Sequence, residues 1–164
     1  MSDPDKYNRT NVYGSELVLQ YAQKHKVKMV VAASSAAVYG DIPEKLPIDE
    51  SNLYGGKSPY AETKWQMEEI MQKYNQDHGV PAIALRFFNV YGPRQDPTSP
   101  YSGVISKFMD MATKNADVTI FGDGEQTRDF VYVKAMPSRC TWVGVGSPEP
   151  GCRWVLCRMW RERS

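Results

Sequence analysis

Two short stretches decide how this chain folds. Residues 34–40 read Ser-Ser-Ala-Ala-Val-Tyr-Gly, and residues 58–64 read Ser-Pro-Tyr-Ala-Glu-Thr-Lys. The first stretch follows an apolar run at residues 30–33 that is typical of a buried parallel strand, so Ser34 and Ser35 are predicted at the carboxyl end of that strand. Ligands bind at such ends in open α/β sheets, although two serines there also fit an ordinary polar strand exit.

The second stretch predicts the start of a helix. Ser58 is a good N-cap, and Pro59 suits the first helical position. Tyr60 and Lys64 then share one helix face. A phenol is a poor base near neutral pH, but an ammonium group one turn away stabilises the phenolate, which favours Tyr60 as a proton shuttle. The alternative is an exposed helical contact without any chemistry.

Hydrophobic periodicity and turn residues predict the other elements. Residues 1–9 carry no structural signal, and residues 41–57 form a loop that either borders a site or is a solvated excursion. The expected elements are an amphipathic helix around residues 12–22, a strand at 29–33, a helix from 59 to about 78 that Gly79 ends, a strand at 81–88, a helix at 101–116 and a strand at 118–121.

Composition limits the range of functions. The chain has 164 residues and a formal net charge of +1, with charges of both signs mixed along it. Neither a nucleic-acid partner nor a membrane is indicated, and a soluble, cytoplasmic protein is expected. Cys140, Cys152 and Cys157 have spacings that match no strong zinc pattern, so no metal is predicted.

Five blocks of sequence carry a resemblance to a known family. They are Asn-Val-Tyr-Gly-Ser at 11–15, the stretches at 34–40 and 58–64, Arg-Phe-Phe-Asn-Val-Tyr-Gly-Pro-Arg-Gln at 86–95, and Phe-Gly-Asp-Gly-Glu-Gln-Thr-Arg-Asp-Phe-Val-Tyr-Val at 121–133. With these blocks the chain resembles the NAD-dependent epimerase/dehydratase family of extended short-chain dehydrogenase/reductases, and within it the UDP-glucose 4-epimerase type. The resemblance covers roughly residues 8–134.

The resemblance implies an α/β fold with a partial Rossmann-type, doubly wound parallel sheet. Residues 1–100 would be the C-terminal half of the NAD-binding domain and residues 101–134 part of a small substrate-binding region. The N-terminal nucleotide-binding half is expected to be missing, because the only glycine before Gly40 is Gly14 and no glycine-rich phosphate loop is possible there.

Residues 135–164 are expected to be a tail unrelated to the family. All three cysteines and three of the four tryptophans lie in this segment, whereas none of the lysines does. We expect no regular helix or strand in it, because neither period appears in the sequence.

The resemblance also implies roles for individual residues. Tyr60, as phenolate, would take the proton from the sugar 4-hydroxyl while NAD accepts the hydride from C4, Ser35 would hydrogen-bond the same oxygen, and Lys64 would support Tyr60 and hold the nicotinamide ribose. The residues that would contact the cofactor are Thr10, Ser34, Tyr60, Lys64 and Phe88. The residues that would contact the nucleotide-sugar substrate, which is expected to be UDP-linked, are Ser35, Asn89 and Arg128, and the complete enzyme is expected to be a homodimer.

One departure from related sequences helps to choose the reaction. Related 4,6-dehydratases carry an Asp-Glu pair after the strand-end residue, whereas this chain has Ala36 and Ala37, which cannot transfer protons. Epimerisation is therefore favoured over dehydration, and reduction and decarboxylation stay as alternatives. A different kind of alternative is a non-catalytic fragment or binding module, because a sheet without its first strands exposes an edge.

Overall fold

The computed structural model describes residues 3–40, 48, 55–99, 102–136 and 153–157. These residues form two compact units, one made of the described residues up to Phe87 with residues 153–156, the other of residues 88–136 with Cys157. Most of the predicted loop at 41–57 lies outside the described residues.

The first unit opens with a continuous helical segment. It consists of α1 (Pro4–Tyr7), the π-helical η1 (Asn8–Tyr13) and α2 (Gly14–Lys24). The Asp3 side chain caps α1 by accepting a hydrogen bond from the Lys6 amide at 3.1 Å, and Pro4 takes the first helical position. The expectation that residues 1–9 carry no structural signal is therefore wrong for residues 4–9, since Asp followed by Pro is a helix start.

A parallel sheet forms the other layer of this unit. Its strand order is β1-β2-β5, with β1 at Val30–Ser35 and β2 at Ala82–Phe87. The two strands are parallel, and Ser34 pairs with Arg86 and Ser35 with Phe87. The predicted α/β class with a parallel sheet is confirmed, and Ser34 and Ser35 are the last two residues of β1.

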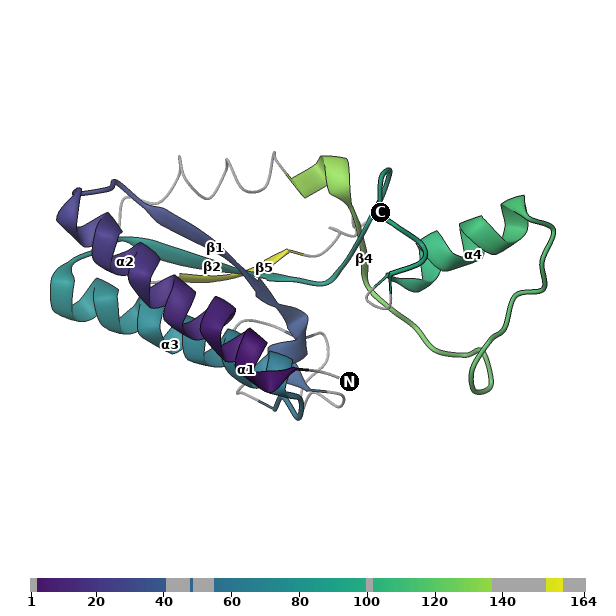
Figure 1. Ribbon diagram of the computed structural model, residues 1–164, viewed down its shortest axis with the longest axis horizontal. Coiled ribbons are helices and arrows are strands. Elements are labelled where there is room, and N and C mark those ends of the chain that lie inside the picture. The colour runs from purple at the N-terminus through teal and green to yellow at the C-terminus, as the bar shows by residue number, and fades with distance from the viewer. Residues whose placement is uncertain (1–2, 41–47, 49–54, 100–101, 137–152, 158–164) are drawn as a thin grey trace. The chain divides into compact units, whose positions relative to one another are not determined.

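The helix α3 (Pro59–His78) connects the two strands and packs beside α2 against the sheet (Figure 1). As predicted, the Ser58 hydroxyl caps it by accepting from the Ala61 amide at 3.1 Å, and Gly79 ends it with a left-handed φ of 64°. The core between helices and sheet is formed by Leu19, Ala22, Met67, Met71, Val80, Ala82 and Ala84.

A short 3₁₀ helix, η2 (Ala36–Tyr39), follows β1 and leads into a close backbone contact. Gly40 has a φ of 77°, and a Cβ at this position would lie 2.1 Å from the carbonyl oxygen of Gly55. The Gly55 amide donates to the Val38 carbonyl at 2.9 Å. Only glycine fits at residue 40, because both its φ and its neighbour exclude a side chain.

The strand β5 (Arg153–Cys157) lies next to β2. It corrects the expectation that no regular element follows Lys134. Trp154 and Val155 belong to the aromatic and β-branched types that favour strands. β2 pairs with β1 on one side, and β5 takes the hydrogen-bonding groups on its other side.

The second unit contains β3 (Asn89–Tyr91), α4 (Val104–Thr113), β4 (Phe130–Tyr132) and the 3₁₀ turn η3 (Val133–Ala135). β3 and β4 pair in parallel, with Asn89 opposite Phe130. The predicted helix at 101–116 is observed in shorter form. The predicted strand at 118–121 is wrong: these residues are irregular and pair with no strand in the described part of the chain, and Phe121 is 82% exposed.

A buried ion pair joins α3 to β2. Arg86 donates from Nη2 to Glu68 Oε2 at 2.7 Å and from Nε to Glu68 Oε1 at 3.0 Å, and its Nη1 donates to the Tyr39 hydroxyl at 2.8 Å. Burial alone would lower the pKa of Arg86, but the hydrogen bonds to Glu68 and Tyr39 and the charge of Glu68 raise it above its ordinary value. The Arg86 guanidinium therefore stays charged although it is buried.

We expect Arg86→Met to lower the free energy of unfolding by about 3–5 kcal/mol, because it leaves the Glu68 carboxylate buried without its cation. The double variant Glu68→Leu with Arg86→Met should regain most of this loss, since no buried charge is left. Urea denaturation of the purified chain measures both.

The matched control is Lys114→Met, which breaks the ion pair between Lys114 and Asp110 on the surface of α4. It should change the free energy of unfolding by less than about 1 kcal/mol. An Arg86→Met chain as stable as the wild type would contradict the role given to the buried pair.

Candidate functional site

Ser35 ends β1 and at the same time caps the next element. Its Oγ accepts a hydrogen bond from the Ala37 amide at 3.2 Å, at the start of η2. The side chain is half-buried. Its hydroxyl hydrogen is not used in this contact, so Ser35 can still donate a hydrogen bond to an oxygen atom at the strand end.

Tyr60 and Lys64 lie on the first two turns of α3, on one face. Lys64 Nζ is 5.8 Å from the centre of the Tyr60 ring and donates to the carbonyl oxygen of Ala33 at 2.8 Å. Ala33 is two residues before Ser35, so this contact brings the Tyr/Lys face of α3 to the carboxyl end of β1. Burial holds the pKa of Lys64 below the ordinary lysine value.

The N-terminal helical segment packs against the same end of α3. The Tyr7 ring meets the Tyr60 ring edge to face at a centroid distance of 5.6 Å. Asn11 Nδ2 donates to Thr63 Oγ1 at 3.0 Å, while the neighbouring Thr10 is exposed on η1. Tyr7 and Asn11 therefore support the first turns of α3 at Tyr60 and Thr63. The hydroxyl group of Tyr60 is the group that the predicted proton transfer uses.

Ser34 differs from Ser35 although the two are adjacent. Ser34 is only 3% exposed, and its hydroxyl donates to Glu68 Oε1 inside the unit. Its side chain therefore serves the interior. A cofactor contact by Ser34 stays a prediction from the resemblance. Because the Ser34 hydroxyl is bonded to Glu68, such a contact would be made by the backbone atoms of Ser34.

Three predicted site residues belong to the second unit. Phe88 is half-buried and directly precedes β3. Asn89 is exposed and its Nδ2 donates to the Asp129 carbonyl at 3.0 Å, and Arg128 is exposed with Nη1 donating to the Thr127 carbonyl at 2.8 Å. Because Asn89 pairs with Phe130, the structure brings Asn89 and Arg128 to the same end of the β3–β4 pair.

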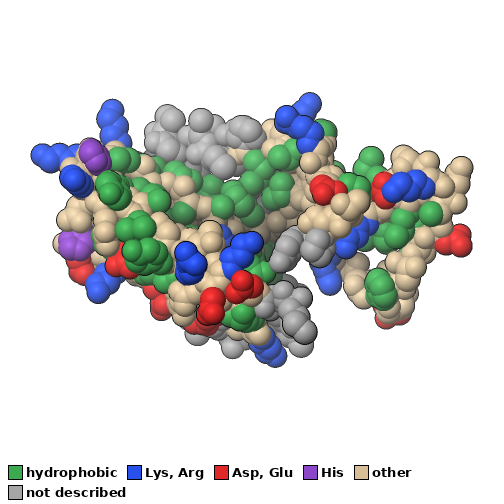
Figure 2. All heavy atoms as spheres, in the orientation of Figure 1, with side chains coloured by type: hydrophobic (Ala, Val, Ile, Leu, Met, Phe, Trp, Pro, Cys, Tyr) green, Lys and Arg blue, Asp and Glu red, His purple; other side chains and the backbone are tan. Residues whose placement is uncertain are grey.

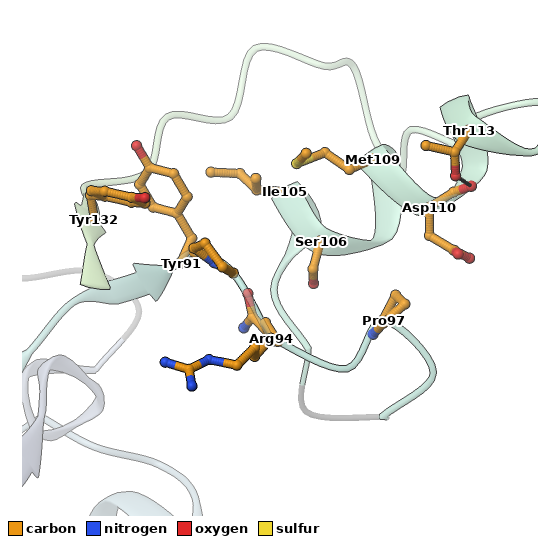
Figure 3. Close-up of a pocket in the computed structure, with 12 residues that line it drawn as sticks. Tyr91, Arg94, Pro97, Ile105, Ser106, Met109, Asp110, Thr113 and Tyr132 are labelled. Atoms are coloured by element: carbon orange, nitrogen blue, oxygen red, sulfur yellow. Dashed lines mark hydrogen bonds between the residues drawn. The ribbon is translucent and has the colours of Figure 1, made fainter. Parts of the chain in front are cut away.

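A pocket of about 570 Å³ lies in the second unit between the turn after β3 and the helix α4 (Figure 3). This volume falls in the usual range of small-molecule sites. Neither Asn89 nor Arg128 lines it. The lining residues are Tyr91, Gly92, Pro93, Arg94, Gln95, Pro97, Ile105, Ser106, Met109, Asp110, Thr113 and Tyr132.

Two of these lining residues were missed by the sequence reasoning. Arg94 has a φ of 72°, which is uncommon for a residue other than glycine and often marks a functional turn. The Oε1 atom of Gln95 is buried and has no hydrogen-bond partner in the described part of the chain. The sequence signal was the polar pair Arg94-Gln95 directly after a strand and a Gly-Pro turn.

The described residues offer neither a metal site nor a membrane span. Among the described residues, no group of three or more His, Cys, Asp or Glu side chains could hold a metal ion. The same residues include no helix that is both long and apolar enough to span a membrane.

Comparisons with known proteins agree with this architecture. The model of the NAD dependent epimerase/dehydratase family matches residues 1–143. A UDP-glucose 4-epimerase of Lactobacillus helveticus is 39% identical over 137 residues, which are 80% of this chain and 41% of the relative. A UDP-N-acetyl-alpha-D-glucosaminuronate decarboxylase of Bacillus cytotoxicus is 40% identical over 128 residues, 76% of this chain and 39% of the relative.

A solved structure is similar over nearly the whole chain. The UDP-N-acetylglucosamine 4-epimerase from Methanobrevibacter ruminantium, in complex with UDP-N-acetylmuramic acid, superposes with a TM-score of 0.85 at 37% identity, covering 93% of this chain and 49% of that protein. The chain thus spans about two fifths to one half of the length of the proteins it matches. It belongs to the NAD-dependent epimerase/dehydratase family.

Proposed function

We propose that this chain carries the catalytic residues of a nucleotide-sugar epimerase, of the UDP-hexose 4-epimerase type. The observation that carries the proposal is the Lys64–Ala33 hydrogen bond of 2.8 Å, because it brings the Tyr60/Lys64 face of α3 to the strand end that holds Ser35. The family match and the epimerases among the similar proteins support the same reaction class.

The proposed chemistry uses each of the three side chains differently. Tyr60, as phenolate, takes the proton from the sugar 4-hydroxyl, and Ser35 donates a hydrogen bond to the same oxygen. Lys64 stabilises the phenolate by its positive charge. When bound, NAD supplies the acceptor for the hydride that leaves C4. After the 4-keto sugar has turned over in the site, its C4 would regain the hydride on the opposite face while Tyr60 returns the proton to the 4-oxygen, and the configuration at C4 is then inverted.

The residues fit one end of NAD. Lys64 and Tyr60 lie side by side at the carboxyl end of a parallel strand, where the nicotinamide ribose can accept hydrogen bonds from a lysine. Thr10, Ser34 and Phe88 are proposed as further cofactor contacts. A glycine-rich loop for the pyrophosphate is not found in the sequence before Gly40, where Gly14 is the only glycine.

Ala36 and Ala37 favour epimerisation over dehydration. They form the first turn of η2 directly after Ser35, and a methyl side chain cannot act as acid or base there. The similar decarboxylase keeps decarboxylation of a nucleotide-linked uronic acid as the second candidate.

A homodimer is part of the proposal. The exposed hydrophobic and aromatic residues of this region include Tyr13, Val18 and Tyr21, with exposed fractions of 59%, 57% and 59%. Figure 2 shows hydrophobic side chains on the face presented by α2 and α3. Met67 and Met71 of α3, in contrast, are buried in the core and are not available to a partner. A cytoplasmic location stays a prediction from the sequence.

The function is tested in a chimera in which residues 8–134 of this chain replace the matching segment of the L. helveticus enzyme. We expect the folded chimera to interconvert UDP-glucose and UDP-galactose or their N-acetylated counterparts, measured by NMR at C4. Tyr60→Phe should lower kcat by about 10²–10⁴-fold, since it removes the acid–base group.

The matched control is Tyr21→Phe. Tyr21 also lies near a lysine of its own helix, with Lys24 Nζ 6.0 Å from its ring centre, but this pair is on the surface. It should leave turnover unchanged, because phenylalanine keeps the exposed aromatic ring that the proposed dimer face uses and only the hydroxyl is lost. A chimera that unfolds cooperatively and binds NAD but neither epimerises these sugars nor decarboxylates a UDP-linked uronic acid would show a non-catalytic module instead. A chimera that keeps its rate with Tyr60→Phe would contradict the catalytic role of Tyr60.

We expect NAD to leave the thermal unfolding temperature of the 164-residue chain unchanged, because the chain has no glycine-rich loop before Gly40 to bind the pyrophosphate. Differential scanning fluorimetry with and without NAD measures this. A transition that NAD moves upward means that a cofactor site forms by other residues.

Arg128→Met should lower the affinity of the chain for UDP by roughly tenfold or more, because one charge-assisted contact to the diphosphate is lost. Titration calorimetry measures the change, and Arg9→Met on the exposed surface of η1 is the control. The variant Arg94→Met tests whether the pocket takes part in binding UDP. If Arg94→Met and Arg128→Met both lower the affinity for UDP, the two residues belong to one binding surface. A loss for Arg94→Met alone would contradict the assignment of Arg128.

A further inference from the structure

Four polar side chains meet in a buried group, which we name the Glu68 cluster. It consists of Ser34, Tyr39, Glu68 and Arg86, with exposed fractions of 3%, 3%, 0% and 1%. Glu68 accepts hydrogen bonds from Ser34 and from two nitrogen atoms of Arg86, and Arg86 donates a further bond to Tyr39. None of these side chains takes part in the proposed proton transfer, and the cofactor contact proposed for Ser34 is made by its backbone.

The cluster is linked to the catalytic residues through α3. Glu68 follows Lys64 by four residues and Tyr60 by eight, so the three lie on successive turns of one helix face. Lys64 bonds to the carbonyl of Ala33, and Glu68 bonds to the hydroxyl of Ser34. Two successive turns of α3 are therefore fixed to two successive residues of β1.

The cluster also fixes both sides of Ser35. Ser34 precedes it and is the register partner of Arg86 on β2. Tyr39 ends η2, the turn that Ser35 caps, and its ring lies 4.8 Å from the Arg86 guanidinium carbon while its hydroxyl accepts from Nη1. The segment that carries Ser35 is thereby held before and after the catalytic hydroxyl.

Any displacement of α3 along the sheet is costly. One helical turn corresponds to about 5.4 Å, and a shift far smaller than this would break the bonds to Glu68. Glu68 and Arg86 would then both be buried charges without partners. The arrangement therefore allows only one position of the helix face.

We propose that the Glu68 cluster is a positioning network that sets the distance of Tyr60 and Lys64 from Ser35. The inference rests on the proposed function for the roles of these three residues. Its own content is geometric: the cluster holds α3 against the end of β1, and Lys64 is kept against the Ala33 carbonyl as a result.

The test follows the titration of Lys64 in the 164-residue chain by ¹³C NMR of its ε-methylene group, assigned with Lys64→Arg. Ser34→Ala and Tyr39→Phe each remove one hydroxyl without changing a charge. We expect the pKa of Lys64 to rise towards its ordinary value in both variants, because a loosened α3 admits more water to the half-buried Lys64 side chain.

The variant Glu68→Gln adds a test in which the two possible causes change the pKa of Lys64 in opposite directions. Lys64 lies against the Tyr60 ring, and the titratable groups of the cluster are Glu68, Arg86 and Tyr39. The Trp65 ring also packs on the cluster, with its centre 5.7 Å from the guanidinium carbon of Arg86. Loss of the carboxylate alone leaves Arg86 unbalanced and lowers the pKa of Lys64, whereas movement of α3 raises it. A rise therefore reports displacement, and Glu69→Gln on the exposed side of α3 is the matched control.

An unchanged titration of Lys64 in folded Ser34→Ala and Tyr39→Phe chains would overturn the inference, even if both are less stable, because the cluster would then stabilise without positioning. These two variants decide the question if Glu68→Gln does not fold. The measurement needs neither NAD nor turnover. A shifted Lys64 in an enzyme that proves inactive would refute the proposed function and leave the positioning network in place.

Discussion

The buried carboxylate of Glu68 is the constraint on which the first unit depends. A charge inside a protein has to be matched by an opposite charge and by hydrogen bonds, or the folded state loses several kcal/mol. Arg86 and Ser34 meet this demand from two neighbouring strands at the same register level. The apolar core makes α3 pack on the sheet, and the ion pair determines where along the sheet it packs.

In the contact between α3 and the sheet, the apolar side chains supply buried surface, whereas the polar side chains determine the exact position of the helix. Met67, Met71 and the alanines of β2 supply buried surface, which tolerates small displacements because it has no direction. The bonds at Glu68 and Lys64 have fixed lengths and angles. Proton transfer requires groups within hydrogen-bond reach, so a site at this helix needs the second kind of contact.

Local signals in the sequence were enough to predict α3, β1 and β2. Ser58-Pro59 and Gly79 mark the two ends of α3 with residues that act through their own backbone neighbours, and apolar runs mark the strands. The shared helix face of Tyr60 and Lys64 was predicted in the same way, since their spacing alone puts them on one face. The Asp3-Pro4 start of α1 carried an equally local signal that was overlooked.

The parts that could not be predicted depend on distant partners. Glu68 bonds to residues 34 positions before it and 18 positions after it, and no local pattern shows such a pairing. A charged residue within an apolar strand, as Arg86 is, was the only hint that a partner must exist. The run at 118–121 looked like a strand, but a strand needs a neighbour, and the described residues supply none. β5 found such a neighbour in β2.

The backbone contact between Gly40 and Gly55 joins the two ends of the segment that lies between η2 and α3. The Val38–Gly55 hydrogen bond closes the chain on itself directly after η2, shortly before the Ser58 cap of α3. The cost of closing a loop grows only slowly with its length. The contact therefore keeps the chain just after η2 next to the chain just before α3, and the cost of this closure would change little with the length of the segment between residues 40 and 55.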